Sequence, residues 1–174
     1  MRYFLSPKVL YGGGALSRLA GEIRGKGNRA VIITGKTTGK FSDKIESILK
    51  DAGYETMVWK GSEPDPSMEA IREGGKVLTD FQPQWIIGLG GGSAIDCAKG
   101  AWLLYERPDL ADADLSASVL PKAKLNLRQK SRFIAIPTTS GTGSEATWGA
   151  VITDKRKRRQ KPSANYARNS PISL

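Results

Sequence analysis

The sequence predicts an α/β fold: a largely parallel, Rossmann-like, doubly wound sheet with helices on both faces and an added β-hairpin near the C-terminus. The first observation is an alternation of short apolar runs with segments whose apolar residues recur every three or four positions. The second is the abundance of glycine, 20 of 174 residues, which suits a fold with many tight turns. The length fits one domain with a sizeable core, and we assign residues 1–174 to it.

The first half of the chain alternates between apolar runs and helical patterns. Ala30-Val31-Ile32-Ile33 is typical of a buried strand, and Ser42-Asp43 offers a helix cap with a carboxylate in the first turn. Gly53 ends that helix, and Gly74-Gly75 weakens the centre of a later one. In chain order we expect a strand at 9–11, a helix over 16–23, a strand at 30–33, a helix from 42 to 53, a strand at 56–59 and, after a proline-containing break at 64–67, a helix through 71–78.

The second half predicts further βα units and then a hairpin. Pro162 cannot donate a hydrogen bond to a central ladder, so the last predicted strand is distorted or lies at an edge. In chain order we expect a strand at 85–89, a helix at 94–105, a long excursion at 106–131 with one short helix, a strand at 133–136, and a hairpin of strands 148–153 and 160–166.

The composition excludes several classes of function. The formal charge is +10, but seven Lys or Arg and no acidic residue fall in 155–174, so the excess is mainly a terminal feature and nucleic acid is an unlikely partner. The chain has no histidine, which excludes His-metal, Ser-His and Cys-His chemistry within it. The single cysteine, Cys97, excludes an internal disulfide and a cysteine-rich zinc site, and we expect a buried, inert thiol.

The N-terminus and the hydropathy pattern predict a cytoplasmic protein. No apolar run approaches the roughly 18 residues of a membrane span. Met1-Arg2-Tyr3-Phe4 lacks an apolar signal core followed by small residues. We therefore expect no membrane partner.

A glycine turn, Gly90-Gly91-Gly92-Ser93, lies between a predicted buried strand and a predicted helix. Glycines let an anion approach the main chain, and a helix N-terminus adds about half a positive charge. The spacing departs from G-x-G-x-x-G because Ser93 stands where the last glycine belongs. The turn therefore predicts a seat for a diphosphate, and the alternative is a glycine-rich turn with no ligand.

Ser93 and Asp96 also match a capping box, in which the serine caps the helix and the carboxylate bonds back to its first turn. If Asp96 has a ligand role, it faces a sugar or the nicotinamide end of a bound dinucleotide, because a carboxylate repels a diphosphate. Lys99, one turn further, is expected to be a charge on the helix surface.

A hydroxyl-rich loop over 137–145 follows the strand predicted at 133–136. The carboxyl ends of parallel strands lie at one edge, so this loop is expected beside the glycine turn, where open α/β sheets bind ligands. Its hydroxyls and glycine backbone can bond ribose and phosphate or line a nicotinamide. The alternative is a loop that is hydroxyl-rich without a ligand.

The end of the strand at 30–33 bears on the choice of cofactor. Gly35 to Lys40 is not a P-loop, because its glycines are one residue too close and Phe41 occupies the Ser/Thr position. An Asp or Glu at this strand end would bond the ribose 2′-hydroxyl of NAD, and here the place holds Thr34-Gly35-Lys36. NADP is therefore favoured over NAD, and the alternative is a turn with ordinary solvated lysines.

Two segments, in this order and separation, strongly resemble the iron-containing alcohol dehydrogenases: Gly90-Gly91-Gly92-Ser93-Ala94-Ile95-Asp96-Cys97-Ala98-Lys99 and Ile136-Pro137-Thr138-Thr139-Ser140-Gly141-Thr142-Gly143-Ser144-Glu145-Ala146-Thr147. The segments 7–12, 64–66 and 151–154 resemble the same family. The resemblance implies an NAD(P)-binding α/β domain followed by a helical domain in which an aspartate and three histidines bind iron or zinc. We expect this chain to match only the first of these domains and to lack the metal-binding one.

The resemblance also implies site residues and a reaction. Hydride passes between an alcohol or aldehyde and the nicotinamide, and this chain is expected to supply the cofactor-binding portion and to be inactive alone. A family lysine near the cofactor is expected to fall on Gln160, with Lys161 one residue late. We expect no catalytic or metal-ligating residue in this chain. The candidate cofactor-binding residues are Gly91, Gly92, Ser93, Asp96, Thr138, Thr139, Thr142 and Thr147.

Other functions remain open at this point. The chain could be a non-catalytic dinucleotide-binding or subunit-interaction module, or a binder of phosphate polymers that uses its basic tail. The expected partners are a nicotinamide dinucleotide, a small alcohol or aldehyde if a metal domain completes the protein, and a second copy in a homodimer.

Overall fold

The main sheet is parallel and has four strands. The computed structural model describes residues 8–113, 125–147, 149–153 and 169–173. The strands are β1 (Arg29–Gly35), β2 (Glu55–Ser62), β3 (Trp85–Gly90) and β4 (Arg132–Pro137), and their order in the sheet is β2-β1-β3-β4. Every neighbouring pair is parallel, which confirms the predicted fold class.

The two central strands are buried because both of their faces carry apolar side chains. Ala30 to Ile33 in β1 have no exposed surface, and β3 is buried along its whole length. Their pairing places Ile32 opposite Ile87 and Thr34 opposite Leu89. A strand covered on both faces has this continuous apolar sequence, in contrast to the alternation of a strand with one wet face.

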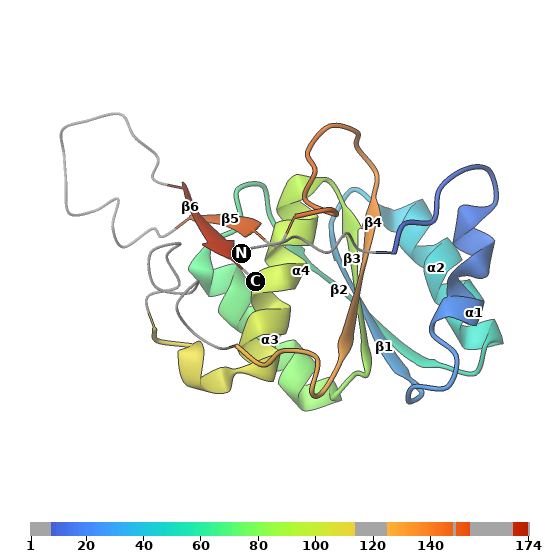
Figure 1. Cartoon of the computed structure of the whole chain (residues 1–174), viewed down its shortest axis with the longest axis horizontal. Helices are drawn as coiled ribbons and strands as arrows, with labels where there is room; N and C mark the ends of the chain where they lie inside the picture. The colour runs from blue at the N-terminus through green and yellow to red at the C-terminus, as the bar shows by residue number, and fades with distance from the viewer. Residues whose placement is uncertain (1–7, 114–124, 148, 154–168, 174) are drawn as a thin grey trace, which may run out of the picture.

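Helices cover both faces of the sheet (Figure 1). On one face, the short η1 (Ala15–Arg18), α1 (Leu19–Glu22) and α2 (Gly39–Asp51) bury Leu19, Ile45 and Leu49 against β1 and β3. On the other face, α3 (Met68–Phe81) and α4 (Gly92–Glu106) bury Leu78 and Ala101 against the same strands. The sheet is therefore doubly wound, as predicted.

The glycines in the middle of α3 have a packing role that the sequence interpretation missed. A Cβ on Gly74 would lie 2.9 Å from Cβ of Ala101, and a Cβ on Gly100 would lie 2.7 Å from Cδ1 of Ile71. Helices α3 and α4 thus approach more closely than side chains would allow. Helix α3 continues without interruption through Gly74 and Gly75.

Several predicted boundaries need correction. Residues 9–11 form no strand. Helix α2 begins at Gly39 after Thr38, and Ser42, the predicted cap, is buried inside its first turn with Oγ donating to the Gly39 carbonyl over 2.7 Å. The short helix expected within 106–131 is η2 (Pro108–Leu110).

The hairpin near the C-terminus is present, with a different second strand. Strand β5 (Gly149–Thr153) pairs in antiparallel fashion with β6 (Asn169–Ser173), whereas the return strand predicted at 160–166 lies outside the described residues. Ala150 and Ile152 of β5 are buried in a cluster with Cys97 and Leu104 of α4. The hairpin therefore packs on the outer side of α4, away from the main sheet.

Within the described residues, no helix combines the length and the apolar composition needed to cross a bilayer.

Candidate functional site

The strand order places a topological switch point between β1 and β3, and we call the carboxyl edge there the crevice. These strands are neighbours, yet β1 leads into α2 on one face of the sheet and β3 leads into α4 on the other. Open α/β sheets bind ligands at the carboxyl edge beside such a point. This edge is the upper one in Figure 1.

The glycine turn lies at this crevice and exposes main-chain amides. Gly90 has a φ of +141°, and Gly91 is the N-cap of α4 in an extended conformation. The N–H groups of Ala94 and Ile95 both donate to the Gly91 carbonyl. Within the described part of the chain, no group accepts a hydrogen bond from the N–H of Gly91, Gly92 or Ser93. Such free donors at a helix N-terminus form a site for an anion.

The hydroxyl-rich loop lies against this turn, as predicted. The N–H of Thr138 donates to the Gly90 carbonyl over 2.9 Å. A Cβ built on Gly91 would lie 3.2 Å from Oγ1 of Thr139, and one on Gly92 would lie 3.3 Å from Cβ of Thr142. The structure thus brings Gly91, Gly92, Thr138, Thr139 and Thr142 together at one edge.

Two residues of the same loop differ from the sequence prediction. Ser144 was not a candidate, although it is buried and its Oγ lies 3.2 Å from a Cβ built on Gly92. Thr147 was a candidate, yet its amide bonds within the loop, to the Gly143 carbonyl over 3.1 Å, and its side chain is exposed. Among the described contacts, none joins Thr147 to the glycine turn.

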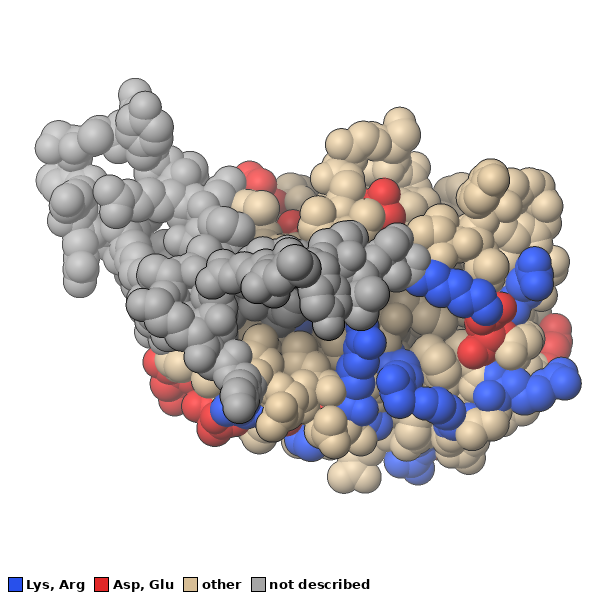
Figure 2. Space-filling view, in the orientation of Figure 1, with Lys and Arg blue, Asp and Glu red and all other residues tan. Residues whose placement is uncertain are grey.

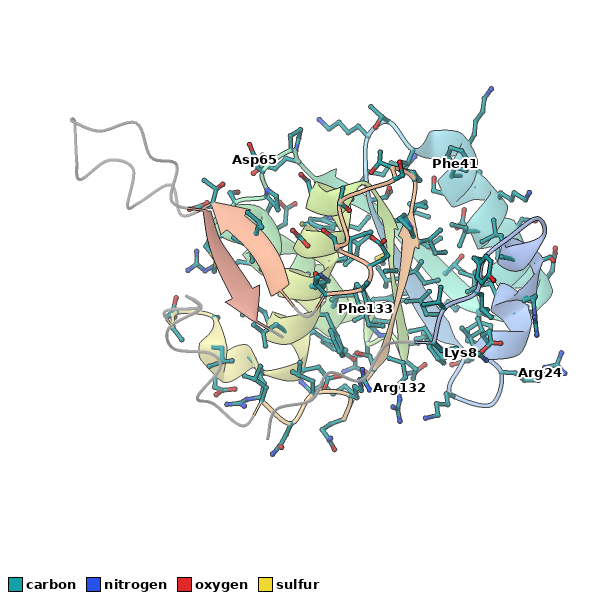
Figure 3. All side chains as sticks on the ribbon, turned by 45° about the horizontal axis from the view of Figure 1, so that its top comes forward. Lys8, Arg24, Phe41, Asp65, Arg132 and Phe133 are labelled. Atoms are coloured by element: carbon teal, nitrogen blue, oxygen red, sulfur yellow. The ribbon has the colours of Figure 1, made fainter. Side chains whose placement is uncertain are left out.

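Ser93 contacts the turn that precedes α3. Its Oγ accepts a hydrogen bond from the N–H of Asp65 over 3.3 Å. Asp65 is exposed and has a φ of +49°, and Figure 3 shows it at the same edge as Phe41, opposite the edge that carries Arg132. The cap of α4 is Gly91, with no side-chain cap bond, so the capping-box alternative for Ser93 is wrong.

Asp96 and Lys99 form a buried pair under the hairpin. Asp96 is 6% exposed and Lys99 is 5% exposed. One Asp96 oxygen accepts from the N–H of Val151 over 2.9 Å, and the other lies 3.5 Å from Lys99 Nζ. Lys99 Nζ also donates to the Gly149 carbonyl over 2.6 Å. The expectations of Asp96 bonding to the first turn and of Lys99 as a surface charge are therefore wrong.

Burial changes the ionisation of the Lys99 ammonium. Desolvation lowers the pKa of Lys99 below its ordinary value, and the nearby carboxylates of Asp96 and Glu145 oppose this shift. A lysine shifted in this direction is held in place by its partners at an energetic cost.

The end of β1 forms the other wall of the crevice and carries no carboxylate. Thr34 Oγ1 donates to the Leu89 carbonyl over 2.8 Å and also bonds with the Thr38 hydroxyl. Gly35 is half-buried and Lys36 is exposed. A Cβ on Gly35 would lie at an ordinary contact distance of 3.5 Å from the Ser62 carbonyl oxygen. A Cβ at position 35 would therefore be accommodated without a shift of the backbone.

Basic side chains gather at the opposite edge of the sheet. Figure 2 shows Lys and Arg mainly on the lower face, whereas the upper edge is mostly uncharged with a few acidic atoms. A depression on the lower side is lined by basic residues and no acidic one, and the basic residues are Lys26, Arg128, Lys130 and Arg132. An anion at the glycine turn would thus depend on main-chain amides and the N-terminus of α4.

A doubly wound parallel sheet with a glycine turn at its switch point defines an α/β protein of the Rossmann-like type. The family model described as iron-containing alcohol dehydrogenase matches residues 6–173. The chain belongs to this family.

Individual relatives agree with this assignment. The chain is 40% identical to an NADPH-dependent butanol dehydrogenase of Clostridium saccharobutylicum, over 95% of the chain and 42% of the relative. It is 31% identical to lactaldehyde reductase of Escherichia coli K12, over 91% of the chain and 41% of the relative. Among solved structures, the iron-containing alcohol dehydrogenase of Thermococcus thioreducens matches with a TM-score of 0.78 and 31% identity, over 88% of the chain and 41% of that structure. The chain thus spans about two fifths of the length of these relatives.

The metal centre implied by the family resemblance does not fit the described residues. That centre needs an aspartate and three histidines, and this chain has no histidine. The part of the chain that the structure describes holds no group of three or more His, Cys, Asp or Glu that could bind a metal ion. The glycine turn does have the donors that the diphosphate of a nicotinamide cofactor needs, because the amides of Gly91, Gly92 and Ser93 have no acceptor among the described residues.

Proposed function

We propose that this chain is the NAD(P)-binding α/β domain of a metal-dependent alcohol dehydrogenase and that it binds the diphosphate of the cofactor at the glycine turn. The observation that carries the proposal is the set of amides at Gly91, Gly92 and Ser93, which have no acceptor among the described residues and open beside the hydroxyl loop. Free amides together with the helix dipole favour an anion there. Thr139, whose Oγ1 lies 3.2 Å from a Cβ built on Gly91, would donate its hydroxyl group to the same ligand, and Thr142, which packs beside Gly92, would line it.

The proposal assigns different roles to the remaining candidate residues. Thr138 fixes the loop to β3 through its main-chain bond to Gly90. Thr147 lines the nicotinamide or adenine side by analogy with the family. Asp96 uses both carboxylate oxygens inside the protein, so we propose that it supports the site from below and does not contact the diphosphate.

We propose NADP as the preferred cofactor. An acidic residue at the end of the first strand would repel a 2′-phosphate, and here Gly35 and the exposed Lys36 occupy that place. A lysine at this position attracts the extra phosphate. The 40% identical relative from Clostridium saccharobutylicum is NADPH-dependent, in agreement with this preference.

The activity of the complete protein is then alcohol or aldehyde oxidoreduction by hydride transfer, with this chain contributing cofactor binding. Because the chain has no histidine, the metal ligands that the family resemblance implies would have to come from outside this sequence. The isolated chain is expected to show no dehydrogenase turnover when iron or zinc is added. Sustained turnover would contradict the incomplete site. A homodimer remains a prediction, and light scattering of the purified chain measures it.

Fluorescence titration with NADPH and NADH tests the proposal directly. Ser93→Trp places a bulky side chain at the mouth of the turn and is expected to abolish binding. Thr79→Trp is the matched control, because it puts the same side chain on an exposed position near the C-terminal end of α3. If neither nucleotide binds at millimolar levels and RNA binds tightly at physiological salt, the phosphate-polymer alternative is favoured and the proposal is overturned.

A further inference from the structure

A buried ion pair attaches the hairpin to the helix that begins at the glycine turn. We infer that Lys99 is a positioning residue, which fixes the start of β5, just after the hydroxyl loop, so that Thr139, Thr142 and Ser144 lie over the glycine turn. The inference deepens the proposed function and depends on it for its consequence in cofactor binding. The attachment itself depends only on the contacts between α4 and β5.

The hydroxyl loop and the strand that follows it are both tied to the segment formed by β3, the glycine turn and α4. At the start of the loop, the N–H of Thr138 donates to the carbonyl of Gly90, the last residue of β3. Beyond the loop, in β5, Gly149 accepts from Lys99 Nζ, and Val151 donates to Asp96. Both anchors therefore lie on one continuous β3-turn-α4 segment. A loop fixed in this way has little freedom to move relative to the turn.

The charge of Lys99 contributes more to the position of β5 than to the stability of the fold. An ammonium that is 5% exposed loses most of its hydration, and the distance of 3.5 Å to the Asp96 oxygen is long for a strong ion pair. An apolar side chain of similar length would fill the same space at a lower cost of desolvation. What it could not supply is a hydrogen-bond donor to the Gly149 carbonyl. The function of a lysine at this position is thus to hold β5 in place.

Other contacts keep the hairpin attached when the ammonium is removed. Ala150 and Ile152 are buried against α4. The N–H of Thr153 donates to the Pro66 carbonyl over 2.8 Å. Loss of the Lys99 bond is therefore expected to loosen the start of β5 and the loop before it, without unfolding the chain.

The test compares Lys99→Met with Ile45→Val, which perturbs the fully buried face between α2 and the sheet. Hydrogen exchange followed by mass spectrometry is measured first, without nucleotide. In Lys99→Met we expect faster exchange in peptides covering 138–153 and unchanged exchange in β1 and α2. Unchanged exchange over 138–153 would overturn the inference.

Nucleotide binding gives the second measurement, because a residue that only stabilises the fold would not change the Kd for the nucleotide selectively. The Kd for NADPH is expected to rise at least about tenfold in Lys99→Met and to stay within about twofold of the parent in Ile45→Val. Equal Kd values in the parent and in Lys99→Met would overturn the positioning role. If the parent chain binds no nucleotide, the proposed function fails, and the exchange data alone decide whether Lys99 fixes the loop.

Discussion

Two glycines of the same turn are expected to fail in different ways when each is replaced by alanine. Gly90 has a φ of +141°, and a Cβ there would lie 2.7 Å from Cβ of Ala94. Holding a residue with a side chain in this conformation costs about 1–3 kcal/mol. The shift of α4 needed to relieve the contact with Ala94 adds to that cost. We therefore expect Gly90→Ala to lower the free energy of unfolding by about 3 kcal/mol.

Gly92 is the first residue of α4 and does not have a positive φ. A Cβ there would lie 3.2 Å from Ser144 Oγ and 3.3 Å from Thr142 Cβ, which small shifts of the loop can accommodate. Alanine is also the better helix former by up to about 1 kcal/mol, so Gly92→Ala is expected to leave stability within about 1 kcal/mol of the parent. The added methyl group narrows the gap between turn and loop, and nucleotide affinity is expected to fall about tenfold.

Urea denaturation followed by tryptophan fluorescence gives both free energies of unfolding, and titration with NADPH gives the affinity of Gly92→Ala. Gly141→Ala provides the control for backbone strain alone, because Gly141 has a φ of +91° and open space around its Cβ position. A loss of stability in Gly90→Ala no larger than in Gly141→Ala would refute the steric part of the reasoning. A stable Gly92→Ala with full affinity would show that the gap between turn and loop is not where the cofactor binds.

Three further predictions follow from other residues. Gly35→Asp is expected to change the ratio of the Kd for NADPH to the Kd for NADH by at least about tenfold in favour of NADH, because the carboxylate accepts from a ribose hydroxyl and repels a 2′-phosphate. Paired titrations measure the two constants. An unchanged ratio would exclude Gly35 as the determinant of cofactor preference. Glu106→Ala is expected to cost about 3 kcal/mol in urea denaturation, because its buried carboxylate accepts hydrogen bonds from Gln129, Lys130 and Ser131; a cost below about 1 kcal/mol would contradict that role. Burial raises the pKa of Cys97 from 9.0 to about 12, so the folded chain is expected to resist a thiol reagent at pH 8 and to react only as it unfolds.

The sign of the Cys97 effect on stability follows from the same shift. The folded state keeps the thiol protonated, so its contribution is complete below pH 9.0 and is lost as the pH rises toward 12. Rapid labelling of native protein at pH 8 would contradict the buried position.

The strands and the doubly wound topology could be predicted because they follow from local sequence. Val31 to Ile33 and Ile86-Ile87 are apolar without alternation, which only a strand buried on both faces explains. Helix boundaries were less predictable. Ser42-Asp43 has the composition of a cap, yet the helix begins three residues earlier at Gly39, since a glycine and a lysine carry no local signal for a start.

The two walls of the crevice were predicted, but the support beneath them was not. Gly91 and Thr139 meet because the ends of parallel strands lie at one edge, which the order of motifs already implies. The pairing of Asp96 and Lys99 with β5 is a contact between residues about fifty positions apart, and no local pattern specifies it. A signal did exist: α4 is apolar all round, so the charged residues within it had to be buried and paired.

Helix α4 also determines how the crevice can deform. At its C-terminal end, Glu106 binds the N–H groups just before β4, and at its N-terminal end the turn binds Thr138 just after β4. The same helix thus braces that edge strand at top and bottom, and the three elements β3, α4 and β4 behave as one stiff frame. We therefore expect any widening of the crevice on ligand binding to come from the opposite wall, formed by α2 and the end of β1.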